Sequence, residues 1–91
     1  MSDQNDSIDV KNNQSAHRFE AQVDGGMAIA DYQLSGQDIV FTHTEVPEQS
    51  RGHGVGEALA KAGLDWAHEK GLTVIPECPF IAEYMSRHGV S

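Results

Sequence analysis

The residues from His43 to Gly56 combine the features of an anion-binding site. Arg51 to Gly56, the glycine loop, reads RGHGVG, with three glycines at alternate positions after an arginine. Glycines let the backbone turn sharply and expose main-chain N–H groups that no Cβ shields. A helical pattern begins at Val55, so these groups also lie at a helix N-terminus, where the helix dipole is positive. A phosphate or pyrophosphate is the expected ligand.

The spacing of the glycines excludes two common phosphate loops. The pattern GxxxxGK[ST] is absent, because no Lys-Ser or Lys-Thr follows the glycines. The dinucleotide pattern GxGxxG is also unmet, because the spacing is GxGxG and no second strand with an acidic end follows. The pattern that fits is R-x-x-G-x-G, with Arg51, Gly54 and Gly56 at its fixed positions.

Cys78 is the second residue that could take part in chemistry. It precedes Pro79 and a helical pattern, so it is expected at the start of a helix, which is a common place for reactive cysteines. The alternative is that Cys78 is a small buried apolar residue, which is the usual role of a single cysteine. The sequence leaves both roles open.

Three other side chains are candidates for proton transfer. Glu45 could act as a general base, or it could be a solvated carboxylate. His43 could act as a base and Tyr84 as a proton donor, although a structural role is favoured for both. The histidine, cysteine and acidic residues show no recognised ligand spacing, so no metal site is predicted.

Five segments have the composition of β-strands, because apolar and polar residues alternate or because β-branched residues run together. They are Ile8 to Lys11, His17 to Val23, Met27 to Leu34, Gln37 to Val46 and Leu72 to Ile75. Asp24-Gly25 predicts a tight hairpin turn, because both residues can adopt a positive φ, and Ser35-Gly36 predicts a second turn. The second to fourth segments therefore form an antiparallel meander. The apolar run Ile39 to Phe41 predicts that the last of these strands is covered on both faces.

Two helices position the candidate residues. One follows the glycine loop and ends before Gly71, and the other runs from Pro79 to His88. A right-handed crossover makes the strands on either side of the first helix parallel neighbours. Their carboxyl ends then lie side by side, one carrying the glycine loop and the other Cys78. The predicted fold class is α+β, an antiparallel meander plus a parallel strand pair, with two helices packed on the sheet.

The composition indicates one small soluble domain. The chain has 91 residues, of which 38% are apolar and 22% charged. Residues 1–7 are polar and are expected to be a flexible tail, which leaves residues 8–91 as the compact domain. No apolar run approaches a membrane span, the N-terminus does not resemble a signal peptide, and one cysteine cannot form an intrachain disulfide. A cytoplasmic location is expected.

The net charge of −8 limits the partners. Such a surface repels nucleic acids and anionic membranes, so neither is an expected partner. It also repels a phosphorylated ligand, so cations must be placed locally, and Arg51, His53 and Lys61 lie in or just after the glycine loop. An acidic surface suits a cationic acceptor such as an amine, or it serves solubility alone.

The pattern R-x-x-G-x-G resembles the acetyl-coenzyme A pyrophosphate loop of the GCN5-related N-acetyltransferases (GNAT superfamily). The segments HTEVP, RGHGVGEALA and VIPECPFIAEYMSRH extend this likeness to the small single-domain GNAT-like proteins, from about Arg18 to His88. The resemblance implies a GNAT-like fold, in which the two parallel strands splay apart and the pantetheine arm lies between them. It also implies a cysteine before the last helix, matched by Cys78. The coenzyme A-binding residues that it implies are Val46, Arg51, Gly52, His53, Gly54, Val55 and Gly56.

Two classes of function fit these residues. The first is an acetyltransferase that moves an acetyl group from acetyl-coenzyme A to an amine of a small molecule or protein. Backbone N–H groups would polarise the thioester carbonyl, and water, Glu45 or His43 would remove the amine proton. In a variant of this mechanism, Cys78 carries the acetyl group as a covalent intermediate. The second class is a non-catalytic module that binds coenzyme A, an acyl-coenzyme A or a partner protein. The acceptor is undefined, and a monomer or weak dimer is expected.

Overall fold

The computed structural model describes residues 8–89; the predicted tail, residues 1–7, and residues 90–91 lie outside the described part. The elements in chain order are β1 (Val10–Asn13), β2 (Arg18–Val23), β3 (Gly26–Ser35), β4 (Asp38–Glu45), the 3-10 helix η2 (Glu48–Ser50), α1 (Val55–Lys70), β5 (Thr73–Pro76) and α2 (Pro79–His88). No helix within residues 8–89 has the length and apolar composition that spanning a membrane requires.

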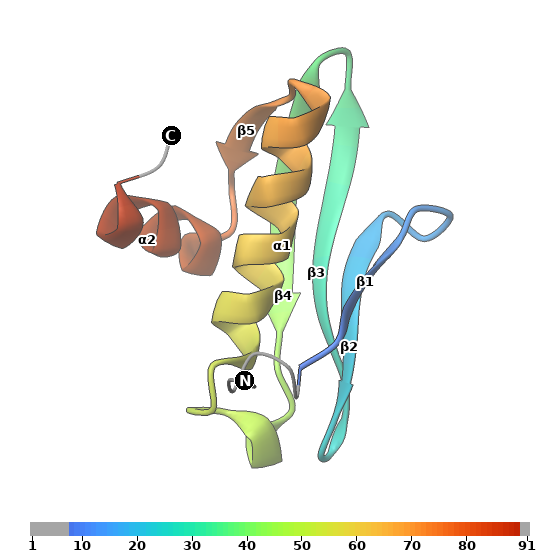
Figure 1. The fold of residues 1–91 in the computed structure, drawn as a ribbon, viewed down its shortest axis with the longest axis vertical. Helices are drawn as coiled ribbons and strands as arrows, with labels where there is room; N and C mark the ends of the chain where they lie inside the picture. Colours follow the sequence, from blue (N-terminus) through green and yellow to red (C-terminus); the bar gives the residue numbers. More distant parts are fainter. Residues whose placement is uncertain (1–7, 90–91) are drawn as a thin grey trace.

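The strands form one five-stranded sheet in the order β1-β2-β3-β4-β5. The pairs from β1 to β4 are antiparallel, and β4 and β5 are parallel. The helix α1 connects the two parallel strands and lies over one face of the sheet, whereas α2 lies beside β5 (Figure 1). The predicted α+β class, with its meander, its parallel pair and its two helices, is confirmed, and the arrangement is GNAT-like.

Aromatic and small residues form the contact between α1 and the sheet. Phe19, Tyr32 and Phe41 are almost fully buried in this layer. Gly63 allows α1 to approach closely, because a Cβ at this position would lie 2.8 Å from the ring of Phe41. The ring of Trp66 lies 5.7 Å from that of Tyr32, centroid to centroid, and so closes the aromatic cluster. This packing fixes the direction in which α1 leaves the glycine loop.

The predicted hairpin at Asp24-Gly25 joins β2 to β3, whereas the predicted bounds of the first strand are wrong in detail. The strand β1 begins at Val10 and continues past Lys11 to Asn13. Side-chain contacts hold these extra residues in the sheet, because Asn13 donates a hydrogen bond to Glu20. In the first hairpin, Gly25 has a φ of 92°, whereas Asp24 does not have a positive φ. The positive φ angles of this turn are thus those of Gly25 and of the next residue, Gly26, which has a φ of 138°.

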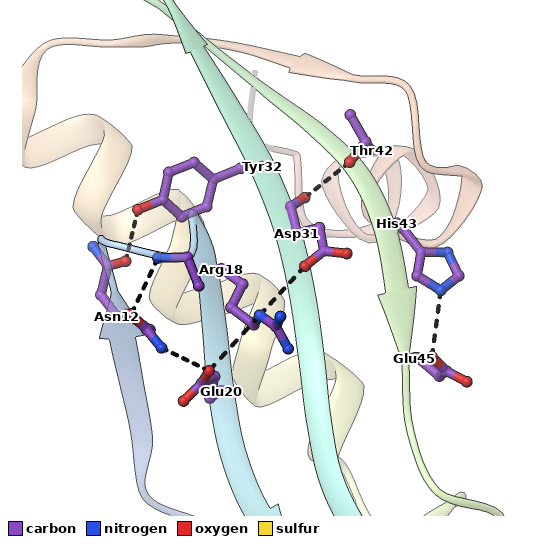
Figure 2. Close-up of polar contacts among 10 residues, drawn as sticks. Asn12, Arg18, Glu20, Asp31, Tyr32, Thr42, His43 and Glu45 are labelled. Atoms are coloured by element: carbon purple, nitrogen blue, oxygen red, sulfur yellow. Dashed lines mark hydrogen bonds and ion pairs between the residues drawn. The ribbon is translucent and has the colours of Figure 1, made fainter.

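The prediction that β4 is covered on both faces is also wrong. Ile39 and Phe41 are buried on the face that meets α1, but Val40 is only half-buried on the other face. Figure 2 views the sheet from that other face, and both helices lie behind the strands. The apolar run indicates a central strand correctly, because β4 pairs on both edges, but it does not indicate the number of covered faces.

A β-bulge in β4 sets which side chains face the helices. Asp31 pairs with His43 and Tyr32 pairs with Phe41, so Thr42 is one extra residue on β4. The hydroxyl of Thr42 donates to the main-chain oxygen of Asp31 at 3.5 Å (Figure 2). After the bulge the alternation is shifted by one residue. Thr44, opposite the buried Ala30, therefore faces the helices, and His43 faces away from them.

Candidate functional site

The strands β4 and β5 part after Phe41, and a cleft opens beyond that point. Their pairing ends at Phe41 and Pro76, and the Cys78 N–H donates a last hydrogen bond to the Phe41 oxygen at 2.9 Å. The end of β4, the glycine loop and the start of α2 enclose a volume of about 600 Å³. The residues that line it are His43, Thr44, Glu45, Val46, Ser50, Arg51, Gly52, Gly54, Val55, Gly56, Glu57 and Phe80.

The glycine loop presents a run of unpaired donors to this cleft. Within residues 8–89, no main-chain N–H from Gly52 to Glu57 has a hydrogen-bond partner, and the first helical bond joins Ala58 N–H to the Gly54 oxygen at 3.0 Å. Gly52 and Gly54 have φ angles of 83° and 81°, which side chains rarely allow. Gly54 is the N-cap of α1 and has no side-chain cap. These donors and the positive end of the α1 dipole together suit an anion.

The glycine loop is braced against the hairpin that joins β2 and β3. The buried hydroxyl of Ser50 donates to the Asp24 oxygen at 2.7 Å. Gly25 allows this contact, because a Cβ on it would lie 2.7 Å from Oε1 of Gln49. The brace holds η2 and therefore the first residue of the loop in place.

The three predicted cations have different surroundings. Arg51 lines the cleft, and its Nε donates to the Val46 oxygen at 3.2 Å. His53 lines a separate hollow of about 320 Å³ beside the hairpin. Lys61 donates to Asp65 at 2.9 Å, and this hydrogen bond raises its pKa. Among residues 8–89, Arg51 is thus the single lysine or arginine that lines the cleft.

His43 and Glu45 form a pair on the sheet face opposite α1. His43 Nε2 lies 3.5 Å from Glu45 Oε1, and the two side chains are 58% and 66% exposed. Figure 2 shows them beside a second polar group on the same face, in which Arg18 Nε lies 3.7 Å from Glu20 and 3.8 Å from Asp31. The bulge in β4 produces this placement. His43 and Glu45 also line the cleft, and both side chains are open to solvent.

Cys78 lies directly behind the wall of the cleft. It is the N-cap of α2, as its position before Pro79 indicated, and it is 5% exposed. Its Sγ lies 3.2 Å from Oγ1 of Thr44, and Thr44 lines the cleft whereas Cys78 does not. The sulfur is thus one side chain away from the space in which a ligand would lie.

Tyr84 belongs to the packing of α2. It is 8% exposed, and its ring stacks on His88 with the centroids 4.1 Å apart. Tyr84 is not among the residues that line the cleft. Within residues 8–89, no group of three or more His, Cys, Asp or Glu side chains is placed to hold a metal ion.

Four lining residues have no role in the sequence interpretation, namely Thr44, Ser50, Glu57 and Phe80. Phe80 contacts the first turn of α1, where a Cβ on Gly56 would lie 2.8 Å from its ring. A glycine inside the first turn of a helix is a signal of such a close approach, but it does not identify the partner. Glu57 Oε2 lies 3.6 Å from Nη2 of Arg87, a residue of α2. Contacts between two helices cannot be read from either helix alone.

Comparison with known proteins identifies the family. The sequence profile described as GCN5-related N-acetyl-transferase matches residues 18–90. The chain belongs to this family. The GNAT match covers β2 to α2 and includes the whole cleft.

Vertebrate relatives extend the similarity over most of the chain. Protein NATD1 of Mus musculus is 33% identical over 89 residues, which cover 94% of this chain and 81% of the relative. Protein NATD1 of Gallus gallus is 33% identical over 84 residues, covering 89% and 76%. Protein NATD1 of Homo sapiens is 33% identical over 84 residues, covering 89% and 74%. The similarity therefore spans 89–94% of this chain and 74–81% of these relatives.

Proposed function

We propose that this GNAT protein binds acetyl-coenzyme A in the cleft and transfers the acetyl group to an amine. The observation that carries the proposal is the run of unpartnered main-chain N–H groups from Gly52 to Glu57, beside the point where β4 and β5 part. Such donors at a helix N-terminus suit a pyrophosphate. Membership of the GNAT family makes coenzyme A the expected source of that pyrophosphate.

The residues of the cleft divide into a phosphate end and a reaction end. The N–H groups of the glycine loop, with Arg51, would bind the pyrophosphate. Val46, between this loop and β4, would offer main-chain groups to the pantetheine arm. His43, Thr44 and Glu45 lie nearer the point where the strands part and would surround the reacting carbonyl. When bound, acetyl-coenzyme A supplies an activated acetyl thioester.

Glu45 is the proposed base. It is exposed at the cleft, so it can accept a proton from an incoming ammonium group and leave a nucleophilic amine. His43, 3.5 Å away, orients the carboxylate. Main-chain N–H groups on the open edge of β4 would stabilise the negative charge that develops on the carbonyl oxygen. An acidic cleft mouth also attracts a cationic acceptor.

Direct transfer to the amine is favoured over a relay through Cys78. The sulfur is buried behind Thr44, so a relay requires Thr44 to move first. We expect Cys78→Ser to keep the rate of acetyl transfer within about threefold of the parent protein. Mass spectrometry after incubation with acetyl-coenzyme A checks the same point. An acetyl adduct on Cys78 that an added amine consumes, together with a large rate loss in the variant, would show that the relay is used.

Calorimetric titration with coenzyme A and acetyl-coenzyme A tests the binding step, and labelled acetyl-coenzyme A with a panel of amines and peptides tests the transfer. We expect saturable binding in the titration, a higher melting temperature in thermal unfolding with the ligand present, and transfer to at least one acceptor. Binding without transfer to any acceptor would favour the non-catalytic module. Absence of binding would remove the acetyltransferase and the coenzyme A-binding module, and would leave only a module that binds a partner protein.

Arg51→Ala should weaken coenzyme A binding by about three- to tenfold at low ionic strength. The side chain is exposed at the phosphate end of the cleft, so its charge acts through solvent and is screened by salt. Titrations at low and high salt measure this effect, and the difference between parent and variant should shrink at high salt. A loss that did not depend on salt would point to a structural role through the Val46 oxygen instead.

A further inference from the structure

The charge of the cleft is unfavourable for the ligand proposed above, and the following inference rests on that proposed function. Coenzyme A is strongly anionic, and the chain carries a net charge of −8. Two carboxylates, Glu45 and Glu57, line the cleft together with one guanidinium group, that of Arg51. Arg51 also donates its Nε hydrogen to the Val46 oxygen. A further source of positive charge is needed near the phosphate end.

Glu57 is the carboxylate that most directly opposes an anion. It lies in the first turn of α1, within the run of unpartnered N–H groups. Its Oε1 would lie 3.9 Å from a Cβ placed on Gly54, the N-cap. A glutamate in a first turn stabilises the helix through the dipole. The same carboxylate would repel a phosphate that binds to the same helix end.

Arg87 reaches Glu57 from the other helix. Its Nη2 lies 3.6 Å from Glu57 Oε2, and the two side chains are 55% and 50% exposed. Phe80 and Arg87 lie seven residues apart and therefore share one face of α2. Phe80 packs on Gly56, the neighbour of Glu57. The packing of α2 on the first turn of α1 thus holds an arginine against the carboxylate at the N-terminus of α1.

We propose that Arg87 is a positioning residue of the anion site, which neutralises Glu57 and so permits a phosphate to bind at the N-terminus of α1. In this role Arg87 acts through Glu57 and makes no contact with the ligand. An exposed ion pair of this length contributes little to stability. Its effect on a nearby anion is larger, because removing Arg87 leaves an uncompensated carboxylate in the site.

A double-mutant cycle with coenzyme A as the probe tests this role. Arg87→Ala should weaken binding by about three- to tenfold at low ionic strength, and Arg87→Lys should restore most of it. Glu57→Gln should bind as tightly as the parent protein or tighter. In the Glu57→Gln background, Arg87→Ala should change the affinity by less than about twofold, because no charge remains to be neutralised.

Lys61→Ala is the matched control. Lys61 also belongs to an exposed ion pair of α1, with Asp65, and its loss changes the net charge equally, but it does not line the cleft. It should leave the affinity within about twofold. Thermal unfolding of every variant checks that the fold is kept.

The remaining outcomes separate the inference from the function on which it rests. If Arg87→Ala weakened coenzyme A binding equally in the parent protein and in the Glu57→Gln background, Arg87 would contact the ligand directly. That result would overturn the neutralising role. No weakening by Arg87→Ala, with normal binding by the parent protein, would also overturn it and would leave the proposed function intact. Absence of coenzyme A binding by the parent protein would overturn the proposed function, and this inference with it.

Discussion

Replacing Glu45 with glutamine is expected to lower the rate of acetyl transfer by about 10²- to 10⁴-fold, which is the usual contribution of a general base. The amide keeps the shape of the side chain and its position 3.5 Å from His43, but it cannot accept the amine proton. Binding of acetyl-coenzyme A does not depend on this proton. The loss should therefore appear in kcat for the amine, with the affinity for coenzyme A unchanged or higher, because Glu45 is one of the two carboxylates that line the cleft.

Steady-state kinetics with one accepted amine and calorimetry with coenzyme A measure the two quantities separately. Glu48→Gln is the matched control, because it removes the same charge from an exposed residue of η2 that does not line the cleft. It should leave both quantities unchanged. If the Glu45→Gln variant transferred the acetyl group at the parent rate, the base would be water or His43. A variant of His43 that lost most of the rate would then decide between them.

The elements of this fold can be predicted because each has a local signal. Gly54 is the N-cap of α1 and Gly71 is its C-cap, and both have the positive φ that a glycine allows. Pro79 fixes the start of α2 in the same way. The parallel pairing of β4 and β5 follows from the single helix between them. These signals depend on a few consecutive residues, so they can be recognised without knowledge of the tertiary structure.

The parts of the site that the sequence does not predict depend on contacts between distant segments. Thr42 has no property that marks it as a bulge, yet the bulge turns Thr44 toward Cys78 and His43 toward solvent. The contact of Glu57 with Arg87 joins two helices across thirty positions of the chain. Cys78 shows both cases, because the sequence predicts its N-cap position, whereas it leaves burial as one of two alternatives and does not indicate the contact with Thr44.

Replacing Gly54 with valine should weaken coenzyme A binding by about a hundredfold or more. Gly54 has a φ of 81°, which a β-branched residue avoids, so the backbone must turn and redirect the N–H groups on either side. A hydrogen bond to a charged group contributes about 1.5–3 kcal/mol, so two misdirected donors account for the loss. The cost to stability is smaller, at about 1–2 kcal/mol for one left-handed residue.

A control glycine with a positive φ, placed away from the cleft, is needed to separate the loss of coenzyme A affinity from the loss of stability. Gly36, in the turn between β3 and β4, has a φ of 60°, and a Cβ on it would have nothing within 4 Å. Gly36→Val therefore introduces similar strain far from the cleft. We expect denaturant unfolding to show comparable destabilisation of the two variants, and calorimetry to show normal coenzyme A binding for Gly36→Val alone. If Gly54→Val lost affinity only in proportion to its stability, the glycine loop would be a folding element, and the unpartnered N–H groups would need another explanation.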